Sequence, residues 1–162
     1  MLSLTKKTDY ALIALAYLAE RPDRTVSARE IAGGFQMPVA LVMNILKTLH
    51  HAKWLASTRG AKGGYRLAVD LTKVSMHDLI VILEGPVRLA ECVLLEGECL
   101  GPECCKVGKG CPIQGPVTSL HHRMVGFLKD VKIVDVVKTN GHSNGNGNGC
   151  CAGAPTVAVA VN

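Results

Sequence analysis

The sequence predicts a mainly α-helical fold with one small β-hairpin, and three observations lead to this prediction. Apolar residues recur at helical spacing through the first third of the chain. Two strand-like runs then enclose a basic, glycine-rich stretch. Farther along, apolar residues repeat in heptads. Helices followed by a hairpin and a long helix are the order of a winged helix-turn-helix with a C-terminal dimerisation helix.

The first two helices are predicted from apolar spacing and capping residues. The first begins after Thr5 or Thr8, ends before Arg21-Pro22, and has an apolar side made of Ala11, Ala14, Leu15 and Leu18. The second is short, because the capping-box sequence Ser27-Ala28-Arg29-Glu30 opens it and Gly33-Gly34 ends it. A short helix, a tight turn and a longer helix together predict a helix-turn-helix.

The third helix follows Pro38, a residue suited to the first turn of a helix. Its buried side is expected to comprise Val42, Ile45, Leu46 and Leu49. The other side is expected to meet DNA through Ala40, Met43, Asn44 and Lys47. Asn44 is the candidate base reader, since an amide can bond an adenine edge at two atoms. The alternative is an exposed helix residue with no partner.

Residues 54–58 and 65–69 predict two strands joined by a basic, glycine-rich tip. In a winged helix such a hairpin lies along the DNA backbone, and an arginine at its tip enters the minor groove. DNA contacts are therefore expected from Arg59, Lys62 and Gly63. The alternative is a tip that is charged for solubility alone.

The net charge of +5 is concentrated in the first part of the chain. Residues 1–66 contain ten Lys or Arg and four Asp or Glu (10 − 4 = +6), whereas the remainder contains eight and nine (8 − 9 = −1). Such asymmetry indicates a polyanionic partner for the N-terminal part, because neutralised phosphates supply much of nucleic-acid affinity. Ordinary solvated surface is the alternative.

Three segments resemble the Rrf-two family of bacterial winged-helix regulators: Leu4-Thr5-Lys6-Lys7-Thr8-Asp9-Tyr10-Ala11-Leu12, Ser27-Ala28-Arg29-Glu30-Ile31-Ala32 and Ser57-Thr58-Arg59-Gly60-Ala61-Lys62-Gly63-Gly64-Tyr65-Arg66-Leu67. The likeness runs from about residue 1 to about residue 137, and the wing is its most specific part. It implies a homodimeric transcription regulator, often a repressor, that binds a partly palindromic double-stranded DNA operator. Many members sense iron–sulfur status, nitric oxide or redox state through a cluster.

Two further helices are expected beyond the wing. The second capping box, Ser75-Met76-His77-Asp78, opens a helix that Gly85-Pro86 ends. A later heptad seam comprises Val117, Leu120, Met124, Phe127, Val131 and Val134. Two heptads are too few for a free coiled coil, so this helix either pairs with its symmetry mate or folds back on its own domain. The resemblance favours pairing through Val117, Leu120, Met124 and Phe127, with His121 and His122 as polar flanking residues.

Five of the seven cysteines lie in one glycine- and proline-rich segment, residues 92–112. No apolar periodicity there would bury thiols in a core, and clustered thiolates are ligands of metals or iron–sulfur clusters. The candidate ligands are Cys92, Cys99, Cys105 and Cys111. A repeated five-residue spacing selects the middle two, and Cys104 is a near-equal substitute for Cys105. The expected cofactor is a 2Fe-2S or 4Fe-4S cluster, with zinc as the alternative.

The resemblance leaves two ligand sets open. Some family members use a histidine three residues after the last cysteine, but that position is Gln114 here. Others take a carboxylate from the first helix of the partner subunit, and Asp9 occupies that place. Four cysteines without any foreign ligand are the other possibility. The vicinal pair Cys150-Cys151 lies outside the family pattern and is expected to be an accidental exposed pair.

Five parts of the chain are expected: a winged helix-turn-helix DNA-binding domain (1–70), a linking helix (71–91), a cysteine-rich cluster-binding loop (92–112), a dimerisation helix with a C-terminal apolar segment (113–138) and a disordered Gly/Asn-rich tail (139–162). Neither a signal peptide nor an apolar run approaching a membrane span is found, so we expect a cytoplasmic protein without membrane contact.

Two classes of function remain open. The first is a cluster-sensing DNA-binding repressor, of which a zinc- or thiol-based regulator of the same fold is a variant. The second is a small electron-transfer or metal-handling protein whose basic N-terminal half docks an acidic partner. An enzyme is not expected, because no nucleophile, base and acid occur at a spacing that would bring them together.

Overall fold

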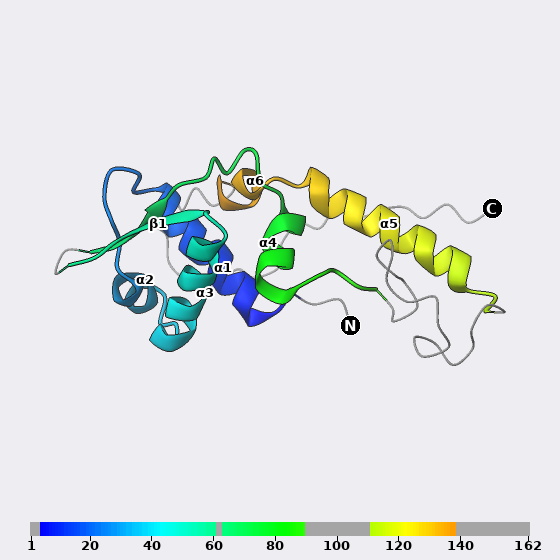
Figure 1. Cartoon of the computed structure of the whole chain (residues 1–162), viewed down its shortest axis with the longest axis horizontal. Helices are drawn as coiled ribbons and strands as arrows, with labels where there is room; N and C mark the ends of the chain where they lie inside the picture. Colours follow the sequence, from blue (N-terminus) through cyan, green and yellow to red (C-terminus); the bar gives the residue numbers. More distant parts are fainter. Residues whose placement is uncertain (1–3, 61–62, 90–110, 139–162) are drawn as a thin grey trace, which may run out of the picture.

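The computed structural model describes residues 4–60, 63–89 and 111–138. The elements are, in order, α1 (Lys6–Ala19), α2 (Ala28–Gly34), α3 (Val39–His51), β1 (Leu55–Thr58), β2 (Gly64–Leu67), α4 (Met76–Glu84), α5 (Gln114–Asp130) and α6 (Ile133–Lys138). Figure 1 shows α1, α2, α3 and the hairpin gathered at one end of the molecule, while α5 extends toward the other end. The predicted fold, mainly helical with a β-hairpin wing and a long C-terminal helix, is confirmed.

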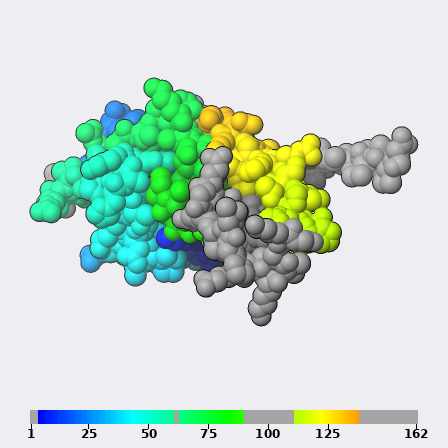
Figure 2. Space-filling model, turned by 45° about the vertical axis from the view of Figure 1, so that its right-hand side comes forward, coloured from blue at the N-terminus to red at the C-terminus, as the bar shows by residue number. Residues whose placement is uncertain are grey.

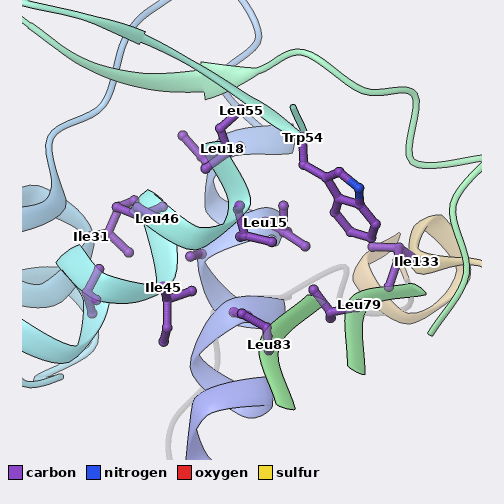
Figure 3. Packing of buried hydrophobic residues seen from close by; sticks show 14 of the residues in the cluster. Leu15, Leu18, Ile31, Ile45, Leu46, Trp54, Leu55, Leu79, Leu83 and Ile133 are labelled. Carbon is purple, nitrogen blue, oxygen red and sulfur yellow. The ribbon is translucent and has the colours of Figure 1, made fainter. Parts of the chain in front are cut away.

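One core joins most of these elements. Figure 3 shows side chains from α1, α2, α3, β1, α4 and α6 converging on it. Its fully buried members include Leu15, Leu18, Ile31, Ile45, Leu46, Leu49, Leu55, Leu79 and Ile133. The buried sides of α1 and α3 are the predicted ones, with Thr8 as an additional buried residue on α1. Helical spacing places such residues on one face, and burial of that face drives the helices together.

The helix-turn-helix differs from prediction at its boundaries. α2 runs through Gly34 instead of ending before Gly33, and Pro38 is the N-cap of α3 instead of its first-turn residue. Ser27 caps α2 by accepting from the Glu30 backbone N–H at 3.1 Å. The return bond of a full capping box is absent from the contacts of Glu30, whose carboxylate is held by Arg24 at 2.5 Å and by the Tyr17 hydroxyl at 3.0 Å. A guanidinium and a hydroxyl from other parts of the chain thus take the place of the local backbone donor.

The hairpin is antiparallel, with Leu55 opposite Leu67 and Thr58 opposite Gly64. A third segment extends it: the Val26 N–H donates to Tyr65 O at 2.9 Å, and the Tyr65 N–H donates to Val26 O at 2.8 Å. This bridge joins the loop before α2 to the wing. Sequence reasoning missed it, because Val26 is a single extended residue without a strand pattern.

α4 has the predicted capping box, with both of its bonds formed between Ser75 and Asp78. Gly85 ends the helix with a φ of +89°, a backbone conformation that glycine adopts without steric cost. Burial would raise the pKa of the Asp78 carboxyl, but hydrogen bonds from the Ser75 side chain and backbone outweigh it and lower that pKa below its ordinary value. The start of α4 is therefore closely specified by local sequence.

The predicted heptad seam is wrong at its end. α5 stops at Asp130, so Val131 and Val134 lie outside it. The chain instead turns back onto its own domain: the Ile133 N–H donates to Val74 O at 3.0 Å, and the Ile133 side chain is fully buried. Burial of this isoleucine and the recovered backbone hydrogen bonds favour the turn over a longer helix. None of the helices in the described ranges is long and apolar enough to cross a membrane.

Candidate functional site

α3 presents an exposed row opposite its buried face. Ala40, Met43, Asn44 and Lys47 are all exposed, and Met43 retains 41% of its accessible surface. These positions follow the i, i+3, i+4, i+7 spacing of one helix side. The structure thus places the predicted DNA-contacting residues of the helix together on one surface. The row contains one cation, one amide and two apolar side chains, a set suited to contacts with a phosphate, a base edge and a thymine methyl group.

The wing ends in the exposed Arg59, beside Gly60 with its φ of +122°. Position 63 requires glycine for a steric reason, since a Cβ there would lie 2.3 Å from the carbonyl oxygen of Thr58. At Gly64 a Cβ would lie 2.5 Å from Val26 O, so the bridge to Val26 also requires glycine. The predicted contact residue Lys62 lies outside the described residues.

His50 connects the end of α3 to the wing, a role that sequence reasoning missed. Its Nε2 lies 3.1 Å from the Ser57 hydroxyl on β1, and its ring lies 6.4 Å from that of Tyr65 on β2. The signal in the sequence is weak: a histidine in the last helical turn, seven residues before a serine of the next strand. The contact holds the wing against the helix with the exposed row.

Two hydrogen-bonded junctions hold the helices on either side of the cysteine segment. The first junction lies before the segment: Thr5, the N-cap residue of α1, and Thr8 in its first turn donate to the Glu84 carboxylate at the end of α4, and the Lys7 ammonium donates to Leu83 O. The second junction lies at the far end of α5, the helix that follows the segment, where the Met76 N–H donates to Val131 O at 2.9 Å. The α4 helix is thus attached to α1 at one end and to the end of α5 at the other. Both helices that flank the segment are fastened to the domain with the exposed row.

Among the predicted metal ligands, only Cys111 and Asp9 are described. Cys92, Cys99 and Cys105 lie outside the described residues, as do Cys104, Cys150 and Cys151. The Cys111 side chain is half-buried, and its carbonyl accepts from the Gln114 N–H at the start of α5. Asp9 is exposed on the first turns of α1. The start of α5 and the start of α1 are far apart in Figure 1, so one chain does not bring these two residues together.

The donor chemistry of this region fits a soft metal or a cluster. A half-buried thiol at the start of a helix, preceded by four further cysteines within the segment, supplies the donors that iron–sulfur clusters and zinc bind. No group of three or more His, Cys, Asp or Glu side chains that could hold a metal ion occurs among residues 4–60, 63–89 and 111–138. Such a site would therefore need the thiols that precede Cys111.

The predicted dimerisation residues lie on an α5 that projects from the domain, as its yellow surface shows in Figure 2. Leu120 and Phe127, seven residues apart, are 56% and 65% exposed, while Val117 and Met124 are half-buried. His121 differs from its expected flanking position: it is only 4% exposed, and its Nδ1 is buried without a hydrogen-bond partner among the described contacts. Burial, with a smaller effect of His122, lowers the pKa of His121.

An exposed recognition-type helix beside a hairpin with an arginine at its tip defines a winged helix-turn-helix, a DNA-binding fold. The sequence model of the Rrf2 family, described as an iron-dependent transcriptional regulator, matches residues 4–139. The chain belongs to this family.

Known relatives agree with this assignment. The chain is 33% identical over 90 residues to a protein of Aquifex aeolicus assigned to the HTH-type transcriptional regulators; the match covers 56% of this chain and 62%, less than two thirds, of the relative. Among solved structures it resembles CymR (YrzC), the global cysteine regulator of B. subtilis (TM-score 0.65, 23% identity, 86% of this chain and 99% of that one). It also resembles T. potens IscR (TM-score 0.64, 20% identity, 91% and 94%). At these identities the structural likeness establishes the fold.

Proposed function

We propose that this chain is a homodimeric, DNA-binding transcriptional repressor of the cytoplasm, and that it senses iron–sulfur, nitric-oxide or redox state through a cysteine-ligated cluster. One observation carries the proposal: the exposed row of α3 lies on a helix whose other side is fully buried, next to a wing that ends in Arg59. A helix so arranged can enter a major groove without disturbing the core behind it.

The DNA contacts divide by chemistry. Asn44 is proposed to read an adenine edge, and Ala40 and Met43 to contact thymine methyl groups. Lys47 is proposed to neutralise a backbone phosphate, and Arg59 to enter the adjacent minor groove. Since the row has a single amide and no arginine, we infer that the wing supplies a large share of the affinity.

The proposed ligands of the sensor are Cys92, Cys99, Cys105 and Cys111, or three of these cysteines with Asp9 of the partner subunit. The separation of the starts of α1 and α5 within one chain supports a carboxylate from the second subunit in the latter case. When bound, an iron–sulfur cluster supplies reversible redox chemistry and reactivity toward nitric oxide and oxygen. The protein's part is to hold it through soft thiolate donors.

Signal transfer is proposed to use the two junctions that hold the helices on either side of the cysteine segment. Glu84 holds the end of α4 on α1, and the end of α5 is bonded to the start of α4. A change in the segment would move these helices and so the spacing of two recognition helices in a dimer. The exposed apolar side chains of Leu120 and Phe127 support α5 as the dimer contact, since pairing would bury them.

The decisive experiment uses the full chain, purified without oxygen. We expect a visible absorption band, a stoichiometric iron content, and binding to DNA fragments enriched from random sequence, with affinity that falls as salt rises. Exposure to nitric oxide or oxygen should bleach the band and change DNA affinity in the same titration. A colourless protein with stoichiometric zinc would contradict the cluster and favour a zinc- or thiol-based sensor of the same fold. Reversible reduction without salt-sensitive DNA binding would favour an electron-transfer protein instead.

A further inference from the structure

An open groove of about 490 Å³ lies between α1 and α6. It is lined by Asp9, Leu12, Ile13, Ala16, Tyr17, Glu20, Phe35, Val136 and Val137. Most of these side chains are apolar, and Phe35 is 47% exposed although its ring packs edge-on against Tyr17 at 5.8 Å. Exposed apolar surface of this kind gains free energy when another apolar segment covers it.

The position of the groove suggests what covers it. Val136 and Val137 line the groove and belong to α6, which ends at Lys138, and residues 139–162 follow that helix in the sequence. These residues contain no Lys, Arg, Asp or Glu. Their first part is rich in Gly and Asn, and their last part alternates valine with alanine, in Val157, Val159 and Val161. We propose that residues 157–161 dock in the α1/α6 groove of the same chain.

The dimensions agree with this occupant. Along α1 the lining residues run from Asp9 to Glu20, a span of about 16 Å at the rise of an α-helix. Residues 157–161 in extended form span about 13 Å. Because successive side chains of an extended segment point to opposite sides, Val157, Val159 and Val161 would all face the groove.

The connection is long enough for the segment to return. Residues 139–156 are rich in Gly and Asn, and a flexible linker of this length has an end-to-end distance of roughly 20–25 Å. The tethered segment therefore has an effective concentration on the order of millimolar at the groove. A weak apolar contact suffices at such a concentration.

The polar rim of the groove also fits an uncharged segment. Its two acids are Asp9 and Glu20, and Glu20 is paired with Arg21 at 2.9 Å. The Arg21 guanidinium also lies 3.7 Å from the centre of the Tyr17 ring. The remaining lining includes aliphatic residues, namely Leu12, Ile13 and Ala16 from α1 and the two valines from α6. This surface suits aliphatic side chains.

Methyl NMR on the full chain, labelled at Ile, Leu and Val methyl groups, tests the proposal without DNA or metal. We expect NOEs from the valines of residues 157–161 to Leu12 and Ile13, and a downfield or upfield shift of those valine methyls by the Tyr17 and Phe35 rings. A mixed sample, in which one population carries labelled Val and the other labelled Ile, should show no such NOEs, since the contact is within one chain.

Matched variants sharpen the test. Val157→Ser, Val159→Ser and Val161→Ser together should abolish the NOEs and return the remaining methyl groups of the tail to random-coil shifts. Ala158→Ser with Ala160→Ser, on the other side of the segment, should preserve them. Random-coil valine signals in the unaltered chain would overturn the proposal, as would NOEs between labelled Val and labelled Ile methyl groups in the mixed sample, because a second copy of the chain would then fill the groove.

Discussion

The buried hydroxyl of Thr8 donates a hydrogen bond to the carboxylate of Glu84, joining the first turn of α1 to the last turn of α4. Thr5 donates to the same carboxylate oxygen. Cys92 follows Glu84 by eight residues (92 − 84 = 8), so the cysteine segment begins close to a point that is tied to the DNA-binding domain. The same contact therefore matters for stability and for the proposed signal.

Replacing Glu84 with Ala should destabilise the fold. The hydroxyl of Thr8 would be left buried without an acceptor, which costs about 1–3 kcal/mol. Denaturant unfolding followed by far-UV circular dichroism measures this change in the free energy of unfolding. Glu84→Gln keeps one acceptor oxygen and should lose less than half as much. Equal stability of the Ala variant and the unaltered chain would show that the junction contributes little.

Gly64→Ala should unfold at a lower temperature, because its Cβ would overlap Val26 O and break the bridge between the wing and the α2 loop. We expect a loss of more than about 1 kcal/mol, the usual result of backbone strain at a crowded position. Gly33→Ala is the matched control: a Cβ there meets nothing within 4 Å, and alanine favours a helix by about 0.5–1 kcal/mol. Calorimetry of both variants should show shifts of opposite sign.

Substitutions on the proposed DNA surface should separate affinity from specificity. Lys47→Ala should weaken binding to all sequences and reduce the slope of log K against log salt by about one. Asn44→Ala should cost about 1–3 kcal/mol on the preferred site and relax selection at one base pair. Lys129→Ala removes a cation from the last turn of α5, which belongs neither to the helix-turn-helix nor to the wing, and should leave DNA affinity unchanged. Fluorescence anisotropy over a salt series distinguishes the three.

Arg59→Ala should weaken operator binding more strongly than Lys47→Ala, since the wing is proposed to provide a large share of the affinity. The appropriate comparison uses the same operator with its flanking A·T tract replaced by G·C pairs, which widens the minor groove. The unaltered protein should lose affinity on that DNA, whereas the variant should be insensitive. An Arg59 variant that still discriminates between the two fragments would place the residue outside the groove.

Cys111→Ala should uncouple DNA binding from redox state. The variant is expected to have lost iron and its visible absorption after anaerobic purification, and to bind DNA equally before and after nitric oxide. A double Cys150→Ser, Cys151→Ser variant controls for thiol loss in general and should retain both iron and response. Full iron content in the Cys111 variant would exclude this residue from the ligand set.

The Asp78 cap should give the protein a specific acid sensitivity. Its pKa is lowered in the fold, so the stability it contributes is present above the ordinary carboxyl pKa of 3.8 and is lost as the pH falls through the lower folded value. Asp78→Asn should be less stable than the unaltered chain at pH 7, and the difference should shrink below about pH 4. Urea unfolding of both proteins at pH 7 and at about pH 4 measures this difference in the free energy of unfolding. A difference that does not change with pH would show that the cap acts through packing.

Local sequence determined several parts of the protein without help from the tertiary structure. Apolar spacing predicted the buried faces of α1 and α3, and through α3 the exposed row that forms the candidate DNA surface. The capping box at Ser75 and the glycine at position 85 predicted both ends of α4. These signals lie within a few residues of the feature that they specify, because helix periodicity and capping are local effects.

Only the tertiary structure decided which distant groups meet. Glu30 binds Arg24 and Tyr17 instead of its own cap, Val26 pairs with Tyr65, and Thr8 meets Glu84. The heptad pattern continued through Val134, yet burial of Ile133 in the core ended α5 at Asp130. Where two local conformations are both favourable, the choice depends on the apolar surface that is buried and the hydrogen bonds that are formed with remote parts of the chain. A local sequence pattern contains no information on these contacts.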